Sequence, residues 1–514
     1  MADAIDAGAP IRIIGDYDVD GVCATYCLLE GLRHLGAHVD ADIPDRKRDG
    51  YGVNPRMIEQ AVRDGVEVIL TCDNGIGAHE AVEAAVRQGL SVIVTDHHEI
   101  AAEGLPKADA VIDPKRSDSV FGEREICGAA VAWQVMRYLY QFMGQPEDLL
   151  DELLPFVALA TVCDVVPLIG DSRIIVREGL IHMKTTDHIG LSALIEACGI
   201  ERDKISAYHL GFILGPCINA CGRMTSAKDA LSLLCEEDPD KAVKKAALVR
   251  MLNERRKQLT DNGLELAIEA AEKAKEHGDK ALVLYVPSCD ESVAGIVAGR
   301  VKEHFYRPTI LLTGEQDGCV KGSGRSVKGY DLFQALNTHA GLFEKFGGHE
   351  QAAGLTIRSD RIDELRRALN GEDAPAEEIL SEKLSIDMVL PFQMCTAELA
   401  EELLRLEPCG MNNRKALFAT RHVGIRRARL FGRDRQVLSL DMFDETGQTL
   451  AGVVFSDAKE MIGRIRQETG VDIVQDPADL LSRIRLTIAY ALNVNDYAGE
   501  RSAQAVIRDV LIEE

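Results

Sequence analysis

The sequence lacks the features that would place it outside the cell or across a membrane. Its thirteen cysteines include no Cys-x-x-Cys pair, and their odd number argues for reduced thiols rather than a disulfide framework. No uninterrupted apolar run reaches the roughly 18 residues that a membrane span needs. The opening "MADAIDAGAP" shows no cationic, apolar signal sequence. We therefore expect a soluble, cytoplasmic protein.

Positive charge is also scarce. Lysine and arginine total 58 against 83 acids, which gives a formal net charge of −25. This balance excludes a generally basic surface, so a nucleic-acid partner would have to be met by a local basic groove. With 514 residues, of which 46% are hydrophobic, the chain is long enough for about two to four domains.

Cysteines at Cys-x3-Cys spacing occur twice, as Cys23/Cys27 and as Cys217/Cys221. No further pair at zinc spacing accompanies the first of them. We therefore expect Cys23 and Cys27 to pack in the core of a helix and not to bind a metal.

The first 120 residues alternate short apolar runs with helical patterns. We expect strands over 11–15, 37–43, 66–71, 91–96 and 109–113, and crossover helices over 21–36 and 76–89. Repeated βαβ units with nearly continuous apolar strands predict an α/β fold with a doubly wound parallel sheet. In such sheets ligands bind beyond the carboxyl ends of the strands.

The rest of the chain changes character twice. Residues 128–280 read mostly as helix, and the charged, amphipathic stretch 240–278 predicts a long helical connector. A smaller α/β unit follows, with strands over 281–287 and 308–314, a helix over 292–306 and the glycine-rich "KGSGRS". This unit ends near residue 358. After an acidic boundary at 370–382, the pattern of 427–455 predicts a small β-barrel or sandwich.

Acids and histidines follow three of the predicted strands, in "IIGDYDVDG", "ILTCDNGIG" and "IVTDHHE". A further acid lies inside the apolar "VALATVCDVVPLI", where it is costly unless paired or coordinated. Carboxylates with one or two imidazoles suit Mn²⁺ or Mg²⁺, and so many carboxylates imply more than one ion. Two such ions are the usual device for hydrolysing phosphate esters. The set comprises Asp16, Asp18, Asp20, Asp73, Asp96, His97, His98 and Asp164.

Each member of this set also has a structural explanation when taken alone. An aspartate before glycine at the end of a strand is commonly a turn or a helix cap, and Asp73 in "DNG" fits a turn. A histidine pair at the end of a strand is as often on the surface as at a metal. The joint occurrence of all these residues favours the metal site.

In this order, "DYDVDG", "DNG", "DHH" and "CDVVPL" resemble the motifs of the DHH phosphoesterase superfamily. The later "GPCINACGRM", "SVAGIVAGRVKEHFYRPTILLT", "GSGRSVKGYDLFQAL" and "FGGHEQAAGLTI" resemble the RecJ family of single-strand-specific exonucleases and its DHHA1 domain. "LEPCGMNNRKALF" resembles the segment that opens the OB domain of this family. The resemblance implies a DHH domain over 1–235, a connector over 236–279, a DHHA1 domain over 280–370 and an OB-like domain over 382–514.

The resemblance also implies roles for individual residues. Five of them would bind two Mn²⁺ or Mg²⁺ ions, namely Asp18, Asp20, Asp73, His97 and Asp164, with Asp73 bridging the ions. Asp16 and Asp96 would support these ligands, and His98 would face the scissile phosphate. Substrate would be held by Asn219, Arg223, Ser323, Arg325, Gly347, Gly348 and His349. "GSGRS" taken alone would equally fit a flexible turn.

The basic run Arg46, Lys47 and Arg48 before a Gly-Tyr-Gly turn is a candidate grip on the DNA backbone or its 5′ end, with a solvated loop as the alternative. Two departures from the family pattern stand out. Cys217 replaces a common arginine, which we expect to weaken a phosphate contact or an internal ion pair. "CGMNN" replaces the glycine-rich element of the OB domain, which puts its affinity for single strands in doubt.

The resemblance implies an exonuclease that degrades single-stranded DNA from the 5′ end to 5′-mononucleotides in DNA repair and recombination. A helicase and a single-strand-binding protein are candidate partners. One alternative is a DHH/DHHA1 phosphodiesterase acting on short RNA or on linear or cyclic dinucleotides, although such enzymes tend to lack an OB domain. The other is a catalytically silent replication scaffold, which would show gaps in the metal set, and this sequence shows none.

Overall fold

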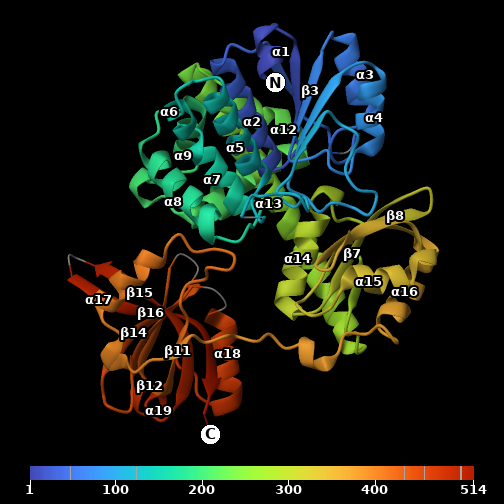
Figure 1. Ribbon diagram of the computed structural model, residues 1–514. Coiled ribbons are helices and arrows are strands. Elements are labelled where there is room, and N and C mark those ends of the chain that lie inside the picture. The colour runs from blue at the N-terminus through green and yellow to red at the C-terminus, as the bar shows by residue number, and fades with distance from the viewer. Residues whose placement is uncertain (47, 123, 433–434, 456–457, 498–499, 514) are drawn as a thin grey trace. The chain divides into compact units, whose positions relative to one another are not determined.

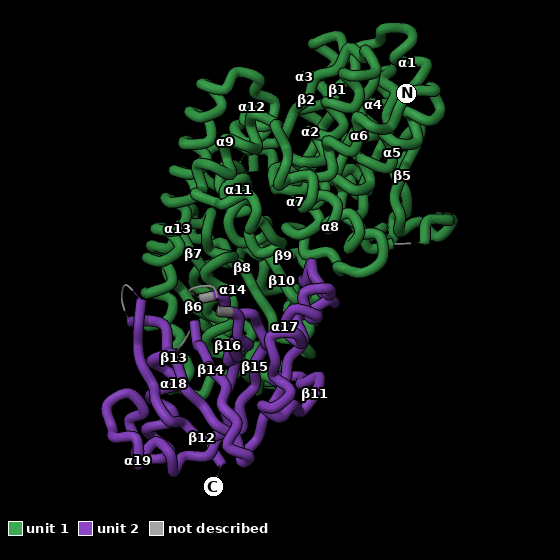
Figure 2. Tube along the Cα trace, turned by 90° about the vertical axis from the view of Figure 1, so that its left-hand side faces the viewer, with its two compact units in different colours: residues 1–382 green, residues 383–514 purple. Residues whose placement is uncertain are grey.

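The computed structural model describes residues 1–46, 48–122, 124–432, 435–455, 458–497 and 500–513 (Figure 1). The chain divides into two compact units, residues 1–382 and 383–514 (Figure 2), and each is described by itself. Within these described ranges, no helix is both long enough and apolar enough to span a bilayer.

The first unit begins with a five-stranded parallel sheet in the order β2-β1-β3-β4-β5. Its strands are β1 (Ile11–Ile14), β2 (Val39–Asp42), β3 (Val68–Cys72), β4 (Ser91–Thr95) and β5 (Ala110–Ile112). The connecting helices are α2 (Val19–His34), α3 (Pro55–Arg63) and α4 (His79–Arg87). The prediction of a parallel sheet is confirmed. Helix α3, which sequence analysis missed, carries the usual signals of a helix start, an Asn54 cap followed by proline.

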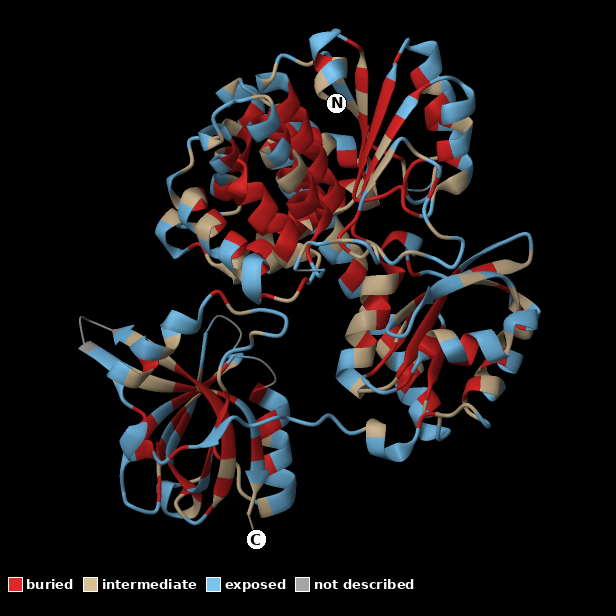
Figure 3. Cartoon of the chain, in the orientation of Figure 1, coloured by how far each residue is buried: buried red, intermediate tan, exposed pale blue. Residues whose placement is uncertain are grey.

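The central strands β1 and β3 are largely buried on both faces, whereas the edge strands β2 and β5 are not, and Figure 3 shows both red and paler strands in this sheet. Ile13 and Leu70 pack on the side of α2, whereas Ile14 and Ile69 pack on the side of α3 and α4. Successive strand residues point to opposite faces, so a sheet covered on both sides needs the nearly continuous apolar runs from which the fold was predicted.

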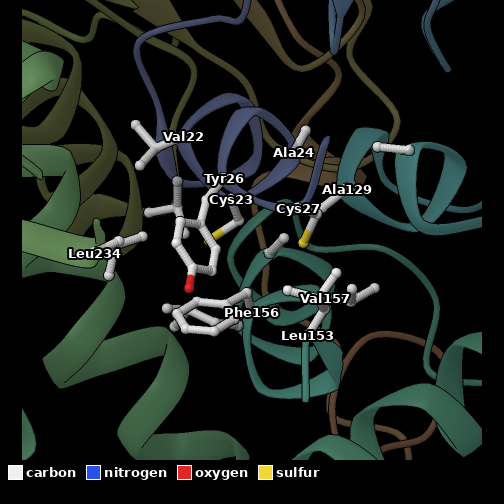
Figure 4. Close-up of a cluster of buried hydrophobic side chains, with 14 of the residues drawn as sticks. Val22, Cys23, Ala24, Tyr26, Cys27, Ala129, Leu153, Phe156, Val157 and Leu234 are labelled. Carbon is white, nitrogen blue, oxygen red and sulfur yellow. The ribbon is translucent and has the colours of Figure 1, made fainter. Parts of the chain in front are cut away.

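A helical layer covers the α2 side. It contains α5 (Gly128–Phe142), α7 (Leu154–Cys163), α8 (Gly170–Thr185), α9 (Ile189–Ala197), α11 (Gly215–Met224) and α12 (Ala227–Leu234), followed by the long α13 (Pro239–Glu276). In Figure 4, Cys23 and Cys27 of α2 lie among apolar side chains that include Phe156 and Val157. Both cysteines are buried free thiols, which confirms their predicted place in a helix core.

The second sheet of this unit is mixed, in the order β6-β7-β8-β10-β9. Its strands are β6 (Leu282–Tyr285), β7 (Thr309–Gln316), β8 (Cys319–Arg325), β9 (Phe343–His349) and β10 (Ala352–Arg358), with helices α14 (Ala294–Phe305), α15 (Leu332–Thr338) and α16 (Ile362–Leu369). The turn considered for "GSGRS" is wrong, because this segment lies in the central strand β8. A Cβ atom at Gly324 would lie 2.6 Å from a Leu332 methyl, which explains a glycine in mid-strand.

Residues 383–514 form a β-barrel. Its strands are β12 (Phe418–Phe431), β13 (Val437–Phe443), β14 (Thr449–Val454), β15 (Leu486–Tyr497) and β16 (Glu500–Ile512), and β11 (Met388–Val389) adds to β12. Pairing of β12 with β15 closes the sheet, so the barrel prediction is confirmed and the sandwich alternative is wrong. The helices are α17 (Ala397–Leu403), α18 (Ala458–Thr469) and α19 (Ala478–Leu481).

Candidate active site

The acids and histidines singled out in the sequence converge at one edge of the parallel sheet. Asp16, Asp18 and Asp20 follow β1, Asp73 follows β3, and Asp96, His97 and His98 follow β4. These three strands are neighbours in the sheet, so their carboxyl ends lie side by side. Asp164 comes from another direction, at the C-terminal end of α7.

Helix N-termini fix two of the acids. Asp18 caps α2 by accepting a hydrogen bond from the Gly21 N–H at 3.0 Å. Asp20 accepts bonds of 2.5 and 2.7 Å from the N–H groups of Gly128 and Ala129 at the start of α5. Both contacts hold a carboxylate at the positive end of a helix, where its charge is favourable. Gly128 must be a glycine because a Cβ atom there would lie 2.6 Å from the Cβ of Asp73.

Asp73 and His97 form the centre of the cluster. His97 Nε2 lies 3.0 Å from an Asp73 oxygen and 3.6 Å from one of Asp20, and His97 Nδ1 lies 3.8 Å from Asp164. The backbone of Asp73 is left-handed, with φ of 60°, a conformation that non-glycine residues adopt at a cost. The neighbouring turn is held by Asn74, so the Asp73 side chain points to the histidine and not back to its own turn.

Three groups of residues could each hold a metal ion, because within each group the ligand atoms lie within 4.8 Å of one another. The groups are Asp16, Asp18 and Asp73; Asp20, His97 and Asp164; and Asp73, Asp96, His97 and His98. Oxygen donors form the first group and the majority of the second, and the third offers two oxygens and two imidazole nitrogens; such sets suit Mn²⁺ and Mg²⁺. One oxygen of Asp16 is buried and has no hydrogen-bond partner in the part of the chain that the structure describes. These residues therefore fit divalent cations by donor chemistry and by their unsatisfied buried oxygen.

The electrostatics of the cluster point the same way. Burial and the neighbouring Asp18 raise the pKa of Asp16 to about 7, and burial with Asp20 and Asp18 raises the pKa of Asp164 to about 8. The pKa of Asp73 is raised for the same reasons. Carboxylates that crowd each other in this way ionise together only when cations neutralise them.

His98 lies beside the cluster and is paired with Asp96. Its Nδ1 is 2.7 Å from Asp96. Burial opposes protonation, but this hydrogen bond and the charge of Asp96 raise the pKa of His98 overall. Asp96 is held in turn by the N–H groups of Ile76 and His97. Asp96 thus orients His98 and favours its protonated form.

Tyr51 belongs to the same site although sequence analysis did not select it. Its hydroxyl donates to the Asp73 carbonyl at 3.0 Å and lies 3.3 Å from His98 Nε2. Gly50 and Gly52 on either side have positive φ angles of 78° and 69°, so the Gly-Tyr-Gly turn aims the ring at the site. That turn was the available signal.

The same unit contains a cluster of arginines whose pKa values are lowered by burial and by each other's positive charge. Burial and the charges of Arg46, Arg256 and Arg325 lower the pKa of Arg223 to about 10. Burial and Arg46 likewise lower the pKa of Arg325. Among the described residues, none of Arg46, Arg223 and Arg325 forms a salt bridge. The Cζ atom of Arg46 lies 5.5 Å from the centre of the Tyr17 ring. In the sequence Tyr17 stands between Asp16 and Asp18.

The helix α14 begins beside these arginines. A Cβ atom at Gly295 in its first turn would lie 2.8 Å from Arg325 Nη2 and 2.9 Å from Ser323 Oγ. Arg223 Nη1 donates to the carbonyl of Ser292, just before this helix, at 2.9 Å. A guanidinium, a hydroxyl and a helix N-terminus that lie together are suited to an anion. Sequence analysis missed Gly295.

The other residues predicted to hold substrate lie on β9 and on α11. In the second sheet, Ala352 of β10 pairs with both Arg325 of β8 and His349 of β9, so the register aligns the β9 segment Gly347, Gly348 and His349 with Ser323 and Arg325. Asn219 lies one helical turn before Arg223 on α11.

Arg48 differs from Arg46, because its guanidinium pairs with Asp49 at 3.0 Å on an exposed loop. The structure therefore brings Arg46 to the site and leaves Arg48 as the solvated alternative. Lys47 lies outside the described residues. Cys217 is buried, and Asn253 donates to its sulfur at 3.3 Å, so residue 217 offers no exposed phosphate contact in this chain.

Comparisons with known proteins agree with this arrangement. The family model "DHH family, N-terminal domain" matches residues 10–161, the "DHHA1 domain" model matches 278–372, and the "RecJ OB domain" model matches 386–509. Crystal structures of Thermus thermophilus RecJ in complex with Mn²⁺ and with Mg²⁺ match the whole chain at TM-scores of 0.81 and 0.76, with 27% and 26% identity, and 70% and 69% of those chains are covered.

Curated proteins named single-stranded-DNA-specific exonuclease RecJ match over nearly the full length. Identity is 35% to the Dickeya dadantii protein, over 97% of this chain and 86% of the relative, and 33% to the Escherichia coli protein, over 99% and 89%. The Bacillus subtilis protein is 32% identical over 99% of this chain, which spans only 62% of that longer relative. The chain belongs to the RecJ family.

Proposed function

We propose that this chain is a metal-dependent exonuclease that degrades single-stranded DNA in the 5′-to-3′ direction to 5′-mononucleotides, in DNA repair and recombination. The observation that carries the proposal is the presence in one unit of two clusters of crowded like charges, with no salt bridge between them among the described residues. The carboxylates around Asp73 call for cations, and the arginines around Arg223 call for an anion. A phosphodiester with two divalent ions supplies both.

In this proposal Asp18, Asp20, Asp73, His97 and Asp164 hold two Mn²⁺ or Mg²⁺ ions. When bound, such ions act as Lewis acids on the phosphate and lower the pKa of water. Asp16 supports the ligand set through its buried oxygen. The backbone N–H groups at the start of α5 hold the Asp20 carboxylate in place.

The histidine next to the ligands serves the phosphate. Asp96 holds the Nδ1 proton of His98, which leaves Nε2 and a positive charge for a phosphoryl oxygen. A fixed cation is most effective where negative charge develops during reaction and water is excluded. The Tyr51 hydroxyl against the same ring limits its rotation.

Arg46, Ser323 and Arg325, with the N-terminus of α14, are the proposed grip on the 5′ phosphate. A guanidinium recognises phosphate by paired hydrogen bonds, and the start of a helix adds main-chain N–H groups. We propose that Asn219, Gly347, Gly348 and His349 line the same grip. Arg223 orders it through the Ser292 carbonyl.

The barrel of the second unit supports a polymeric substrate. Its strand β12 exposes four arginines in an otherwise acidic chain: Arg421, Arg426, Arg427 and Arg429. A basic strand of this kind follows a nucleic-acid backbone, and exposed aromatic rings stack on bases. Phe431 at the end of this strand is half exposed. Such a surface is of little use to an enzyme that cleaves dinucleotides.

We assign the parts of the chain accordingly: a DHH domain over 1–235, a helical connector over 236–279, a DHHA1 domain over 280–370 and an OB-like domain over 382–514. A cytoplasmic location and cooperation with a helicase and a single-strand-binding protein complete the proposal, because the enzyme needs a source of single strands.

One assay tests the whole proposal. The purified chain is offered 5′-phosphorylated single-stranded DNA, duplex DNA, single-stranded RNA and dinucleotides, each with Mn²⁺ and with a chelator. We expect release of 5′-mononucleotides from the 5′ end of single-stranded DNA, only with metal. Digestion confined to dinucleotides would replace the polymer with a small substrate. Cleavage that resists the chelator would contradict the metal centre, and an inert protein that still binds DNA would indicate a scaffold.

A further inference from the structure

Two cysteines without a role in the proposed reaction lie where α9 and α11 pack on α13. The Sγ atoms of Cys198 and Cys217 are 3.7 Å apart, and both are free thiols. Cys217 is buried within α11, whereas Cys198 is partly exposed at the C-terminal end of α9. A disulfide has an S–S distance of about 2.05 Å, so a movement of under about 2 Å would join them.

The surroundings of the pair make its two thiols unequal. The hydrogen bond with Cys217, together with the charges of Arg250 and Lys257, lowers the pKa of Cys198, against burial and Glu254. Arg250 is held there by a 2.5 Å bond to the main-chain carbonyl just before Cys198. The same hydrogen bond and burial raise the pKa of Cys217. A thiolate reacts with oxidants and a thiol does not, so Cys198 reacts first.

The two sides of the pair also differ in freedom to move. Helix α11 is wedged in place, because Cβ atoms at Gly215 and Gly222 would lie 2.2 and 2.6 Å from neighbouring atoms. Cys198 is the C-cap residue of α9. The next residue, Gly199, has a φ of 68°, and no atom lies within 4 Å of the position that a Cβ atom would take there. The end of α9 is therefore the side that moves.

We propose that Cys198 and Cys217 are an oxidation site at which a hydroperoxide forms a reversible disulfide that ties α9 to α11. In the first step the Cys198 thiolate attacks the peroxide. An S–O bond forms, the O–O bond breaks, the sulfur is oxidised to a sulfenic acid, and the peroxide is reduced to an alcohol or water. In the second step the Cys217 sulfur loses its proton and attacks the Cys198 sulfur, and the departing hydroxide takes that proton and leaves as water.

The tie would stabilise the helix that carries Asn219 and Arg223. A disulfide stabilises a protein mainly because it lowers the conformational entropy of the unfolded chain, and this one would close a loop over residues 198–217. Because α11 stays in place while the end of α9 moves, the oxidised protein should keep its nuclease activity. It should also survive heating several-fold longer than the reduced protein.

The test uses the full wild-type chain, treated with hydrogen peroxide in a buffer containing chelator and then digested with trypsin. We expect mass spectrometry to find peptide 185–202 joined to peptide 205–223, lighter by two hydrogens than the separate peptides and separated again by dithiothreitol. Oxidation of Cys198 to a sulfinic or sulfonic acid without the link overturns the proposal. So does the absence of any reaction at these two residues.

Variants assign the bond and test its effect. Cys221→Ser is the matched control, because Cys221 lies on the same helix and in the same peptide, and the link should persist in it. Cys198→Ser should abolish the link and leave Cys217 reduced, whereas Cys217→Ser should let Cys198 oxidise further. A link that passes through Cys221, or an oxidised wild type without longer thermal survival, contradicts the proposal. The mass measurement stands whether or not the chain proves to be a nuclease.

Discussion

The two sheets of the first unit present mirror-image charge problems. At the carboxyl edge of the parallel sheet, crowded acids have raised pKa values, as in Asp16 and Asp164. Beside the mixed sheet, crowded arginines have lowered ones, as in Arg223 and Arg325. Neither cluster is neutralised by the other through a salt bridge among the described residues. In the proposed function each cluster receives a charge brought from outside, cations for one and phosphate for the other.

The strongest test of the acidic side is Asp164→Asn, which removes one charge and keeps the shape of the side chain. We expect nuclease activity at saturating Mn²⁺ to fall about 10³-fold or more, as when a group that stabilises transition-state charge is lost. The measurement is the initial rate on 5′-phosphorylated single-stranded DNA. Asp171→Asn, at an exposed acid in the first turn of α8, is the matched control and should keep wild-type activity. Equal losses in both variants would refute the special role of Asp164.

On the basic side, Arg325→Ala should lower kcat/KM by about 10- to 100-fold, which corresponds to one lost charged hydrogen-bonding group. The loss should fall mainly on KM, and the preference for a 5′-phosphate over a 5′-hydroxyl should shrink. Arg358→Ala removes an arginine of the adjacent β10 that is paired with Asp360 and serves as control. An unchanged 5′-end preference in Arg325→Ala would separate this cluster from the phosphate.

Stability against pH sharpens the comparison without any substrate. Because burial and mutual repulsion raise the folded-state pKa values of Asp16 and Asp164 to about 7 and about 8 from 3.8, the folded state binds more protons than the unfolded state between these values. The free energy of unfolding of the metal-free protein should therefore fall as pH rises from about 4 to about 8.

Denaturant titrations across that pH range measure this slope. Saturating Mn²⁺ should abolish this slope, and Asp164→Asn should reduce it in the metal-free protein. A metal-free protein that becomes more stable as the pH rises over this interval would show that the acids are not crowded as described.

The smallest effect is expected of Tyr51→Phe. Losing the hydroxyl removes its bonds to the Asp73 carbonyl and the His98 ring, each worth about 1 kcal/mol. We expect kcat to fall about fivefold with little change in KM, and the pH profile attributed to His98 to move. A loss as large as that of Asp164→Asn would make Tyr51 essential to the chemistry and not a positioning residue.

The parallel sheet and the gathering of acids at its edge were predictable from the sequence, because parallel strands end at the same edge and apolar runs show where each strand ends. The roles of the individual ligands stay predictions. Asp164 in "VCDVVPL" could be selected from the sequence because an acid within an apolar run is unfavourable unless it is paired or coordinated. In the structure its carboxylate lies 3.8 Å from His97 Nδ1. Local pattern and the physics of burial were sufficient for these features.

Other features depend on contacts that no local pattern reveals. Arg46 and Arg48 are near neighbours in one basic run, yet one lies over Tyr17 and the other pairs with Asp49, because side-chain direction in a loop is set by tertiary contacts. The glycines of β8 indicate a turn by composition, but they lie in a strand, where Gly324 packs closely against Leu332 and Gly322 against Leu312 and Leu355. Tyr51 reaches the site only through the two left-handed glycines beside it.

The left-handed backbone of Asp73 decides which mutation gives a clean experiment there. Asparagine tolerates this conformation better than most residues, so Asp73→Asn removes the charge without distorting the chain. Alanine at the same place would mix a conformational penalty with the loss of a ligand. A homologue that has exchanged this acid for its amide should therefore remain well folded while being unable to cut.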